Sequence, residues 1–220
     1  MSLGAHDPIS TKVTWEREIG PLVQARCVSC HSPGGRAPMS LTTYEEARPW
    51  ARAIREEVLT RRMPMWRVVR GYGDFSNDPS LSPFEVALVA AWADGGAPRI
   101  LPKATTPHLE GATFRSNVSV GVVTPPPVRS TDLPCTARTL PAGRVLGVKP
   151  LLEEGMDLRV TITHADGVQE PLLWLRGFDP RFAETYWLRT PIDVTRATRI
   201  STDGAVPCTL TVLFEAKTAR

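Results

Sequence analysis

The period of the hydrophobic pattern changes part-way along this chain of 220 residues. In residues 11–97 apolar side chains recur at helix-like intervals, as Val13, Ile19 and Val23 do. In residues 108–220 they alternate with polar side chains, which is the period of a β-strand. Because one hydrophobic period cannot serve both kinds of element, the change predicts two domains of different class.

Two segments of the first part carry helix start signals. One helix is predicted to be capped by Thr42 or Thr43 and to be interrupted at Pro49. A second is predicted to begin at residues 82–85, which read Ser-Pro-Phe-Glu, and to end at the glycine pair 95–96.

Residues 113–120, 157–163 and 209–214 alternate between apolar and polar side chains and are separated by proline-rich and glycine-containing turns. Short strands at such spacing are typical of a β-sandwich or jelly roll. We therefore expect an α+β chain of two domains. The predicted parts are an all-α domain at 10–98, a linker at 99–111 and an all-β sandwich or jelly-roll domain at 112–220.

Residues 27–31 read Cys-Val-Ser-Cys-His, which is a C-x-x-C-H motif. Two thiols at this spacing on a helical turn match the two vinyl groups of a porphyrin, and the next histidine can bind its iron. The motif predicts one haem c, attached covalently through Cys27 and Cys30 and ligated by His31.

Two other uses of the same cysteines are open. A thioredoxin-like redox motif normally follows a strand, whereas a helical pattern precedes Cys27. A structural zinc site would need two more ligands, and Cys135 and Cys208 lie far away in the sequence.

A methionine is the expected sixth ligand of the haem iron, because the thioether favours the reduced metal. The candidates are Met39, Met63 and Met65. Met63 is preferred because it follows the second helix on an expected loop; Met65 is the second choice, and Met39 is expected to pack near the haem edge. The alternative is that these methionines only fill gaps in a core.

Two tryptophans and four arginines are further candidates for the haem pocket. Trp50 and Trp66 can line it, although core packing alone would also explain two tryptophans. Arg52 and Arg55, and equally Arg61 and Arg62, can pair with haem propionates, although an arginine on a helix is more commonly solvated.

The first part also resembles one group of bacterial exported cytochromes c, often fused to a copper type II, ascorbate-dependent monooxygenase-like region. The resemblance covers nearly all of residues 15–98. It implies an all-α cytochrome c domain. The family's distal motif usually reads Met-Pro-Pro-Trp, which places its ligand on Met63; Met65 stands where the second proline would be. The matching segments are 18–22, 27–31, 37–41, 44–50, 62–66 and 91–98.

Residues 138–214 resemble, more loosely, the C-terminal jelly-roll domain of those copper monooxygenases, through motifs such as Leu-Pro-Ala-Gly at 140–143. The family's His-x-His copper pair falls here on Pro150 and Leu152, which cannot bind copper. His6, His108 and His164 stand alone in the sequence and do not replace that pair. Copper is therefore not expected.

Cys135 and Cys208 flank the β region and are candidates for a disulfide; two buried thiols are the alternative. A disulfide and a c-type haem both indicate the periplasm. The start lacks a signal-peptide pattern, so the signal peptide is expected to have been removed.

The chain has no apolar run long enough to span a membrane. Its net charge of +3 comes without a basic run, which argues against nucleic acid.

These features predict a periplasmic mono-haem electron carrier, rather than a catalyst, that passes electrons to redox partner proteins. Its β domain would serve docking or assembly. One alternative is a haem-bearing subunit of a larger membrane-associated redox complex. Another is a copper-dependent, monooxygenase-like oxidoreductase.

Overall fold

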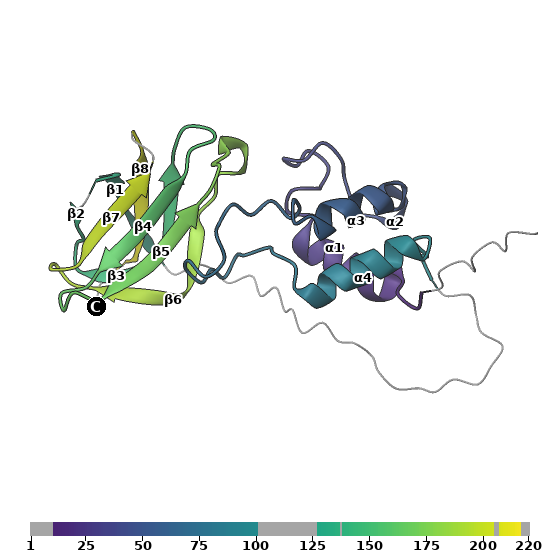
Figure 1. Ribbon diagram of the computed structural model, residues 1–220, viewed down its shortest axis with the longest axis horizontal. Coiled ribbons are helices and arrows are strands. Elements are labelled where there is room, and N and C mark those ends of the chain that lie inside the picture. Colours follow the sequence, from purple (N-terminus) through teal and green to yellow (C-terminus); the bar gives the residue numbers. More distant parts are fainter. Residues whose placement is uncertain (1–10, 101–126, 137, 205–206, 217–220) are drawn as a thin grey trace, which may run out of the picture. The chain divides into compact units, whose positions relative to one another are not determined.

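The computed structural model describes residues 11–100, 127–136, 138–204 and 207–216. These residues form two compact units (Figure 1). The N-terminal unit contains residues 11–65 and 79–100, and the β unit contains 66–78 together with the described residues from 127 onward.

The expected fold class, an all-α cytochrome c domain followed by an all-β sandwich or jelly roll, was wrong. Two four-stranded antiparallel sheets dominate the described regular structure, and the α-helices span only 4 to 12 residues. Residues 66–78, expected within the helical domain, belong to the β unit. Prolines near helix starts and an irregular stretch from Ser32 to Ser40 break the helical pattern into short pieces.

The N-terminal unit contains four short α-helices together with one π-helix and one 3₁₀-helix. In chain order they are η1 (Trp15–Ile19), α1 (Gly20–Arg26), α2 (Tyr44–Ala47), η2 (Arg48–Trp50), α3 (Ala51–Leu59) and α4 (Pro83–Asp94).

Local sequence signals explain where these helices begin. Thr43 caps α2 and Ser82 caps α4, and in each case a glutamate three residues later completes a capping box. Pro49 lies in η2, which separates α2 from α3. The predicted starts of both helices, the interruption at Pro49 and the end of α4 at Gly95 are confirmed.

An aromatic cluster forms the centre of the N-terminal unit. Trp92 of α4 is fully buried, and its ring centroid lies 5.9 Å from that of Trp15. Its indole nitrogen donates to the carbonyl oxygen of Pro98 at 3.1 Å. The Tyr44 hydroxyl donates to the carbonyl oxygen of Ala97 at 2.9 Å. These bonds satisfy polar groups that burial would otherwise leave unpaired.

The β unit contains two antiparallel sheets. One has the strand order β1-β8-β3-β6 and the other β2-β7-β4-β5. The strands are β1 (Val128–Pro134), β2 (Arg138–Thr139), β3 (Gly143–Leu151), β4 (Leu158–Thr163), β5 (Gln169–Leu175), β6 (Tyr186–Val194), β7 (Arg199–Gly204) and β8 (Thr209–Glu215), with a 3₁₀-helix η3 (Pro180–Phe182) between β5 and β6.

The two sheets share one core. Leu158, Val160 and Ile162 of β4 are fully buried and cluster with Val212 and Phe214 of β8 in the other sheet. Alternate residues of each strand face this core, which is how two sheets pack face to face. The predicted strands at 157–163 and 209–214 are confirmed as β4 and β8. The predicted strand at 113–120 and most of the predicted linker at 99–111 lie outside the described residues.

A segment that we call the strap, residues 66–78, pairs with one edge strand of each sheet. On β5, the Val69 amide donates to the carbonyl oxygen of Trp174 at 2.8 Å. On β6, the Ser76 amide donates to the carbonyl oxygen of Trp187 at 2.8 Å. The strap thereby satisfies backbone groups that an uncovered sheet edge would expose.

Cys135 and Cys208 form the predicted disulfide, with their Cα atoms 5.3 Å apart. It links the end of β1 to the start of β8, where the Cys135 amide also donates to the carbonyl oxygen of Cys208 at 3.1 Å. Within the described part of the chain, no helix combines the length and the apolar character needed to cross a bilayer.

Candidate functional site

The Cys-x-x-Cys-His segment forms a tight turn at the end of α1. The Cys27 amide donates to the carbonyl oxygen of Val23 at 2.8 Å and so closes the helix. The amides of Cys30 and His31 then both donate to the carbonyl oxygen of Cys27, at 3.0 and 2.9 Å. The structure therefore brings Cys27, Cys30 and His31 together on one hydrogen-bonded turn.

The imidazole of His31 is oriented by a backbone group. Its Nδ1 lies 3.1 Å from the carbonyl oxygen of Met39. Since a carbonyl oxygen only accepts, Nδ1 carries the proton of this contact, and in the neutral ring Nε2 then has the free lone pair. Histidines that bind metals are commonly fixed in this way, with one ring nitrogen donating to a carbonyl and the other facing the metal.

The loop that supplies the Met39 carbonyl folds back on the cysteine turn. The Gly35 amide donates to the carbonyl oxygen of Ser32 at 2.8 Å, and the Ala37 amide donates to that of Cys30 at 3.1 Å. At Gly35 a Cβ atom would collide with the carbonyl oxygens of Cys30 and Ser32. A glycine is therefore required where the loop closes against the motif.

Both motif cysteines are free thiols. Cys27 packs against the core of the N-terminal unit, and burial, with a smaller contribution from Cys30, raises the pKa of its thiol to about 12. The nearby Arg26 opposes this rise. The Cys30 sulfur accepts from Arg36 Nη2 at 3.4 Å. Catalytic redox cysteines have a lowered thiol pKa, so the surroundings of Cys27 differ from those of a thioredoxin-like motif.

Two free thiols and a histidine whose neutral ring leaves Nε2 available form the donor set that covalent haem attachment needs. These residues fit a haem c. In the part of the chain that the structure describes, no group of three or more His, Cys, Asp and Glu side chains is placed to hold a metal ion.

Met63 and Met65 lie on an irregular loop that follows α3 in the N-terminal unit. The amides of Arg61 and Arg62 donate to the carbonyl oxygens of Val58 and Glu57, at 3.1 and 2.9 Å, which is a Schellman motif. Arg61 takes the left-handed position of this motif, with φ of 59°.

Two arginines fix the start of this loop. The Arg62 guanidinium pairs with Glu57 at 2.8 Å and lowers the pKa of that carboxyl. Arg61 Nη1 donates to the carbonyl oxygen of Leu81 at 3.1 Å, close to the start of α4. Residues 63–65, which we call the methionine loop, therefore leave α3 from a defined position.

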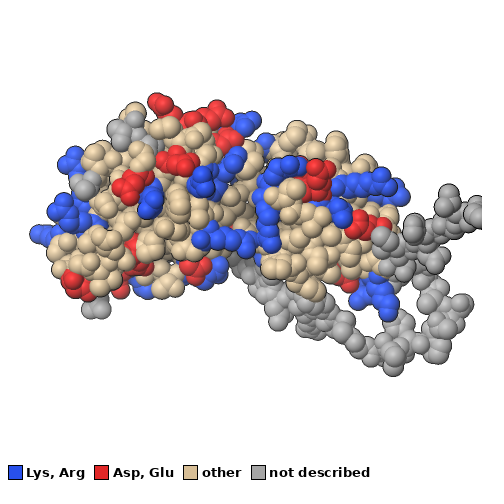
Figure 2. All heavy atoms as spheres, in the orientation of Figure 1, with Lys and Arg blue, Asp and Glu red and all other residues tan. Residues whose placement is uncertain are grey.

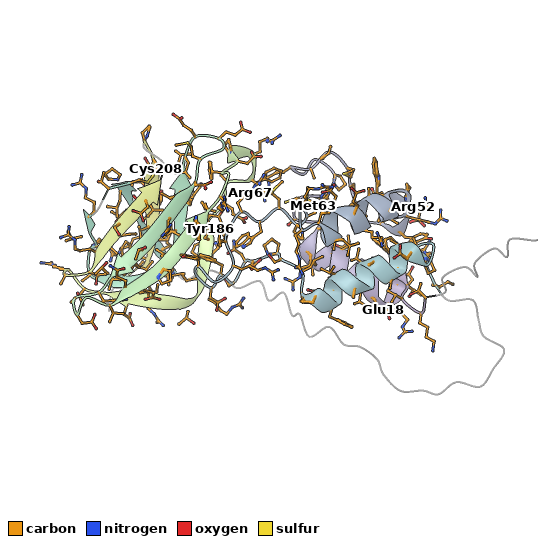
Figure 3. All side chains as sticks on the ribbon, in the orientation of Figure 1. Glu18, Arg52, Met63, Arg67, Tyr186 and Cys208 are labelled. Carbon is orange, nitrogen blue, oxygen red and sulfur yellow. A yellow bond between two sulfur atoms is a disulfide. The ribbon has the colours of Figure 1, made fainter. Side chains whose placement is uncertain are left out.

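The side chains expected to line the haem pocket are divided between the two units. Trp50 is 43% exposed, and Arg52 is exposed near the start of α3, at the opposite end of that helix from Met63 (Figure 3). Arg55 forms an ion pair with Asp94 of α4 at 2.8 Å. Trp66 packs in the β unit, with its ring centroid 5.2 Å from that of Tyr186.

The positions at which the expected resemblance would place a copper pair are apolar. Pro150 and Leu152 are both buried in the β unit. His164 Nε2 lies 2.9 Å from a carboxylate oxygen of Glu170. His6 and His108 lie outside the described residues.

The sequence did not indicate two parts of this arrangement. One is the Met39 carbonyl that orients His31, which is a backbone group and leaves no side-chain signal. The other is the strap, which joins the β unit although it lies between two helices in the sequence. Trp66 and Val68 flank Arg67 at the strand spacing of two, and this short alternation was the available signal.

No protein-family model matches this chain, and no curated protein matches it. Among solved structures, it is similar to two crystal structures of a pentameric capsid protein isolated from metagenomic phage sequences. Each is 12% identical with a TM-score of 0.25, and the alignments cover 40% of this chain and 61% and 62% of the capsid chains. At this TM-score the likeness supports no conclusion about fold or function.

Proposed function

We propose that this chain is an electron-transfer protein that carries one covalently attached haem c on Cys27 and Cys30, with His31 as the proximal ligand. The single observation that carries the proposal is the hydrogen bond from His31 Nδ1 to the Met39 carbonyl. It fixes the tautomer in which Nε2 is the available metal ligand.

The thiols support the same proposal. Each thiol would add its sulfur to one carbon of a vinyl double bond and its hydrogen to the other, so attachment would need no oxidant and release no leaving group. Both cysteines are reduced, as this addition requires. Their turn is fixed by three backbone hydrogen bonds before any attachment. The bound haem would supply an iron that cycles between two oxidation states.

Met63 is the proposed distal ligand, with Met65 as the second candidate. Both are half-buried and lie on the loop that Arg61 and Arg62 fix at the end of α3. A thioether bound to the haem iron would leave no open position for a substrate, which favours electron transfer over catalysis. The resemblance of residues 15–98 to bacterial exported cytochromes c supports the same assignment.

The disulfide supports a periplasmic location, because such bonds persist in oxidising compartments. The proposed partners are redox proteins, alone or within a membrane-associated complex. In Figure 2 basic and acidic side chains are interspersed over the visible face of the β unit, so no single-sign patch on that face selects the partner by charge.

The test is expression with and without the c-type maturation machinery, followed by acid–acetone extraction and oxidised and reduced absorbance spectra. We expect haem that resists extraction in the wild type and is lost in the Cys27→Ser/Cys30→Ser double variant. Haem that extracts fully from the wild type, or zinc bound in its place, would refute the proposal. A reversible Cys27–Cys30 disulfide without haem would indicate the redox use instead.

The distal ligand needs a separate comparison. Met63→Ala should abolish the weak long-wavelength charge-transfer band of a methionine–iron bond and let carbon monoxide bind the reduced haem. Met39→Ala is the matched control, because it keeps the backbone carbonyl that His31 uses. If Met65→Ala removes the band and Met63→Ala does not, the second candidate is the ligand.

A further inference from the structure

Residues 39–42, which we call the histidine support, contact His31 at two places. The Met39 carbonyl oxygen accepts from Nδ1 of the ring at 3.1 Å, and the Leu41 amide donates to the carbonyl oxygen of His31 at 3.0 Å. Leu41 is 4% exposed in the core of the N-terminal unit. The histidine support is therefore fixed both to His31 and to that core.

One carboxylate oxygen of Glu46 binds two hydroxyls of the histidine support. It accepts from Thr42 Oγ1 at 2.6 Å and from Ser40 Oγ at 2.8 Å, and also from the Thr43 amide at 3.0 Å. The hydroxyl bonds lower the pKa of the Glu46 carboxyl to about 2, so the carboxylate is charged at neutral pH. Hydrogen bonds to a charged acceptor are shorter and stronger than those between neutral groups.

The helix α2 uses only part of this arrangement. The Thr43 amide bond belongs to its capping box, in which Thr43 Oγ1 accepts from the Glu46 amide. The bonds from Ser40 and Thr42 lie outside the capping box and join α2 to the histidine support. On the other side α1 contributes Gln24, whose Nε2 donates to the carbonyl oxygen of Thr42 at 3.0 Å.

We propose that Glu46 is a positioning residue for the proximal ligand, which acts through the histidine support to hold the His31 ring in its hydrogen bond at Nδ1. This inference rests on the proposed function for the role of His31 as a ligand. Glu46 acts through Ser40, which directly follows Met39 in the chain. All of these contacts lie within the N-terminal unit. A hydrogen bond at Nδ1 makes the other ring nitrogen a stronger donor to a metal, so Glu46 would also tune the haem iron.

The experiment compares Glu46→Ala with the wild type in the full-length protein, both unloaded and matured. In the variant the Leu41 amide should exchange with solvent about tenfold faster, because the hydroxyls of the residues on either side of it lose their acceptor. In the unloaded chain the ring nitrogen signals of His31 should shift toward a mixture of the two neutral tautomers. In the matured protein the haem should remain attached and its reduction potential should rise, because the ring becomes a weaker donor.

Glu45→Ala is the matched control, since it makes the same change one residue earlier in α2. Glu45 is exposed and pairs with Arg99 at 2.8 Å. It should leave the Leu41 exchange, the His31 ring signals and the potential unchanged. Glu46→Gln keeps an oxygen acceptor and should restore most of the protection of Leu41.

Thr43→Ala separates positioning from stability. It removes the cap of α2 and keeps the bonds from Ser40 and Thr42 to Glu46. We expect it to lower the melting temperature of the N-terminal unit without shifting the His31 ring signals or the potential.

Ring signals and a potential in Glu46→Ala that match the wild type would overturn the proposal, and so would equal changes in Thr43→Ala. If the wild type attaches no haem, the proposed function fails, and the ring signals and Leu41 exchange of the unloaded chain then decide whether Glu46 positions His31. If Glu46→Ala does not fold, Ser40→Ala makes the same test, because it removes the hydroxyl next to Met39 and keeps the capping box.

Discussion

Gly35 offers a test of the loop that orients His31. In Gly35→Ala the new Cβ collides with the carbonyl oxygens of Cys30 and Ser32. Both are backbone atoms on the folded turn, so the loop must open to make room. Opening it breaks the Gly35–Ser32 and Ala37–Cys30 backbone hydrogen bonds, which measure 2.8 and 3.1 Å.

The expected magnitude follows from those two bonds. At about 1 kcal/mol net for each, the loop loses about 2 kcal/mol, which corresponds to about thirtyfold faster opening-limited exchange. Gly34→Ala is the matched control one residue away. Gly34 has φ of 71° and nothing within 4 Å of a Cβ atom, so alanine there meets conformational strain of about 1 kcal/mol and no collision. Both substitutions reduce the freedom of the unfolded chain equally, so that effect cancels.

The assay is amide hydrogen exchange of Ala37, followed by the His31 ring signals in nuclear magnetic resonance. Gly35→Ala should speed the exchange of Ala37 and disturb His31, because Met39 lies on the same loop. Gly34→Ala should leave the Ala37 amide protected. Equal protection of that amide in the two variants would refute the reasoning, since only Gly35→Ala forces a collision with the two carbonyl oxygens.

Three further outcomes follow from the structure. Replacing Cys135 and Cys208 by serine should lower the free energy of unfolding of the β unit by about 4 kcal/mol, because the disulfide closes a loop of 73 residues in the unfolded chain. A reductant added to the wild type should produce the same loss in a urea titration. Hydrogen bonds from the hydroxyls of Thr42 and Ser40 lower the pKa of the Glu46 carboxyl from 4.5 to about 2. Its contribution to the free energy of unfolding is therefore complete above pH 4.5 and is lost as the pH falls toward 2. In Glu46→Gln the free energy of unfolding should change less with pH over that range of an acid titration. Ser82→Ala should cost about 1 kcal/mol in thermal unfolding of the N-terminal unit, because it removes the cap of α4, and an unchanged melting temperature would contradict this.

Local chemistry made part of this protein predictable from its sequence. Thr43 and Ser82 each precede a glutamate at the spacing of a capping box, so the helix starts depend on residues three apart. The alternation in 157–163 and 209–214 gives one apolar face to a strand, which is sufficient to predict β4 and β8. The Cys-x-x-Cys-His spacing likewise defines its donor set within one turn.

The fold class and the support of the site depend on contacts between distant residues. Residues 66–78 were expected within the all-α domain at 10–98, yet their backbone pairs with two sheet edges and Phe75 is buried in the β unit. The hydrogen bond between His31 and the Met39 carbonyl uses a backbone atom that every residue possesses, so no residue type in the sequence indicates it. The sequence by itself determined the capped helix starts, two of the strands and the thiol spacing. Only the tertiary structure decided which segment covers the sheet edges and which carbonyl orients the histidine, because both are hydrogen bonds made by backbone groups that all residues share.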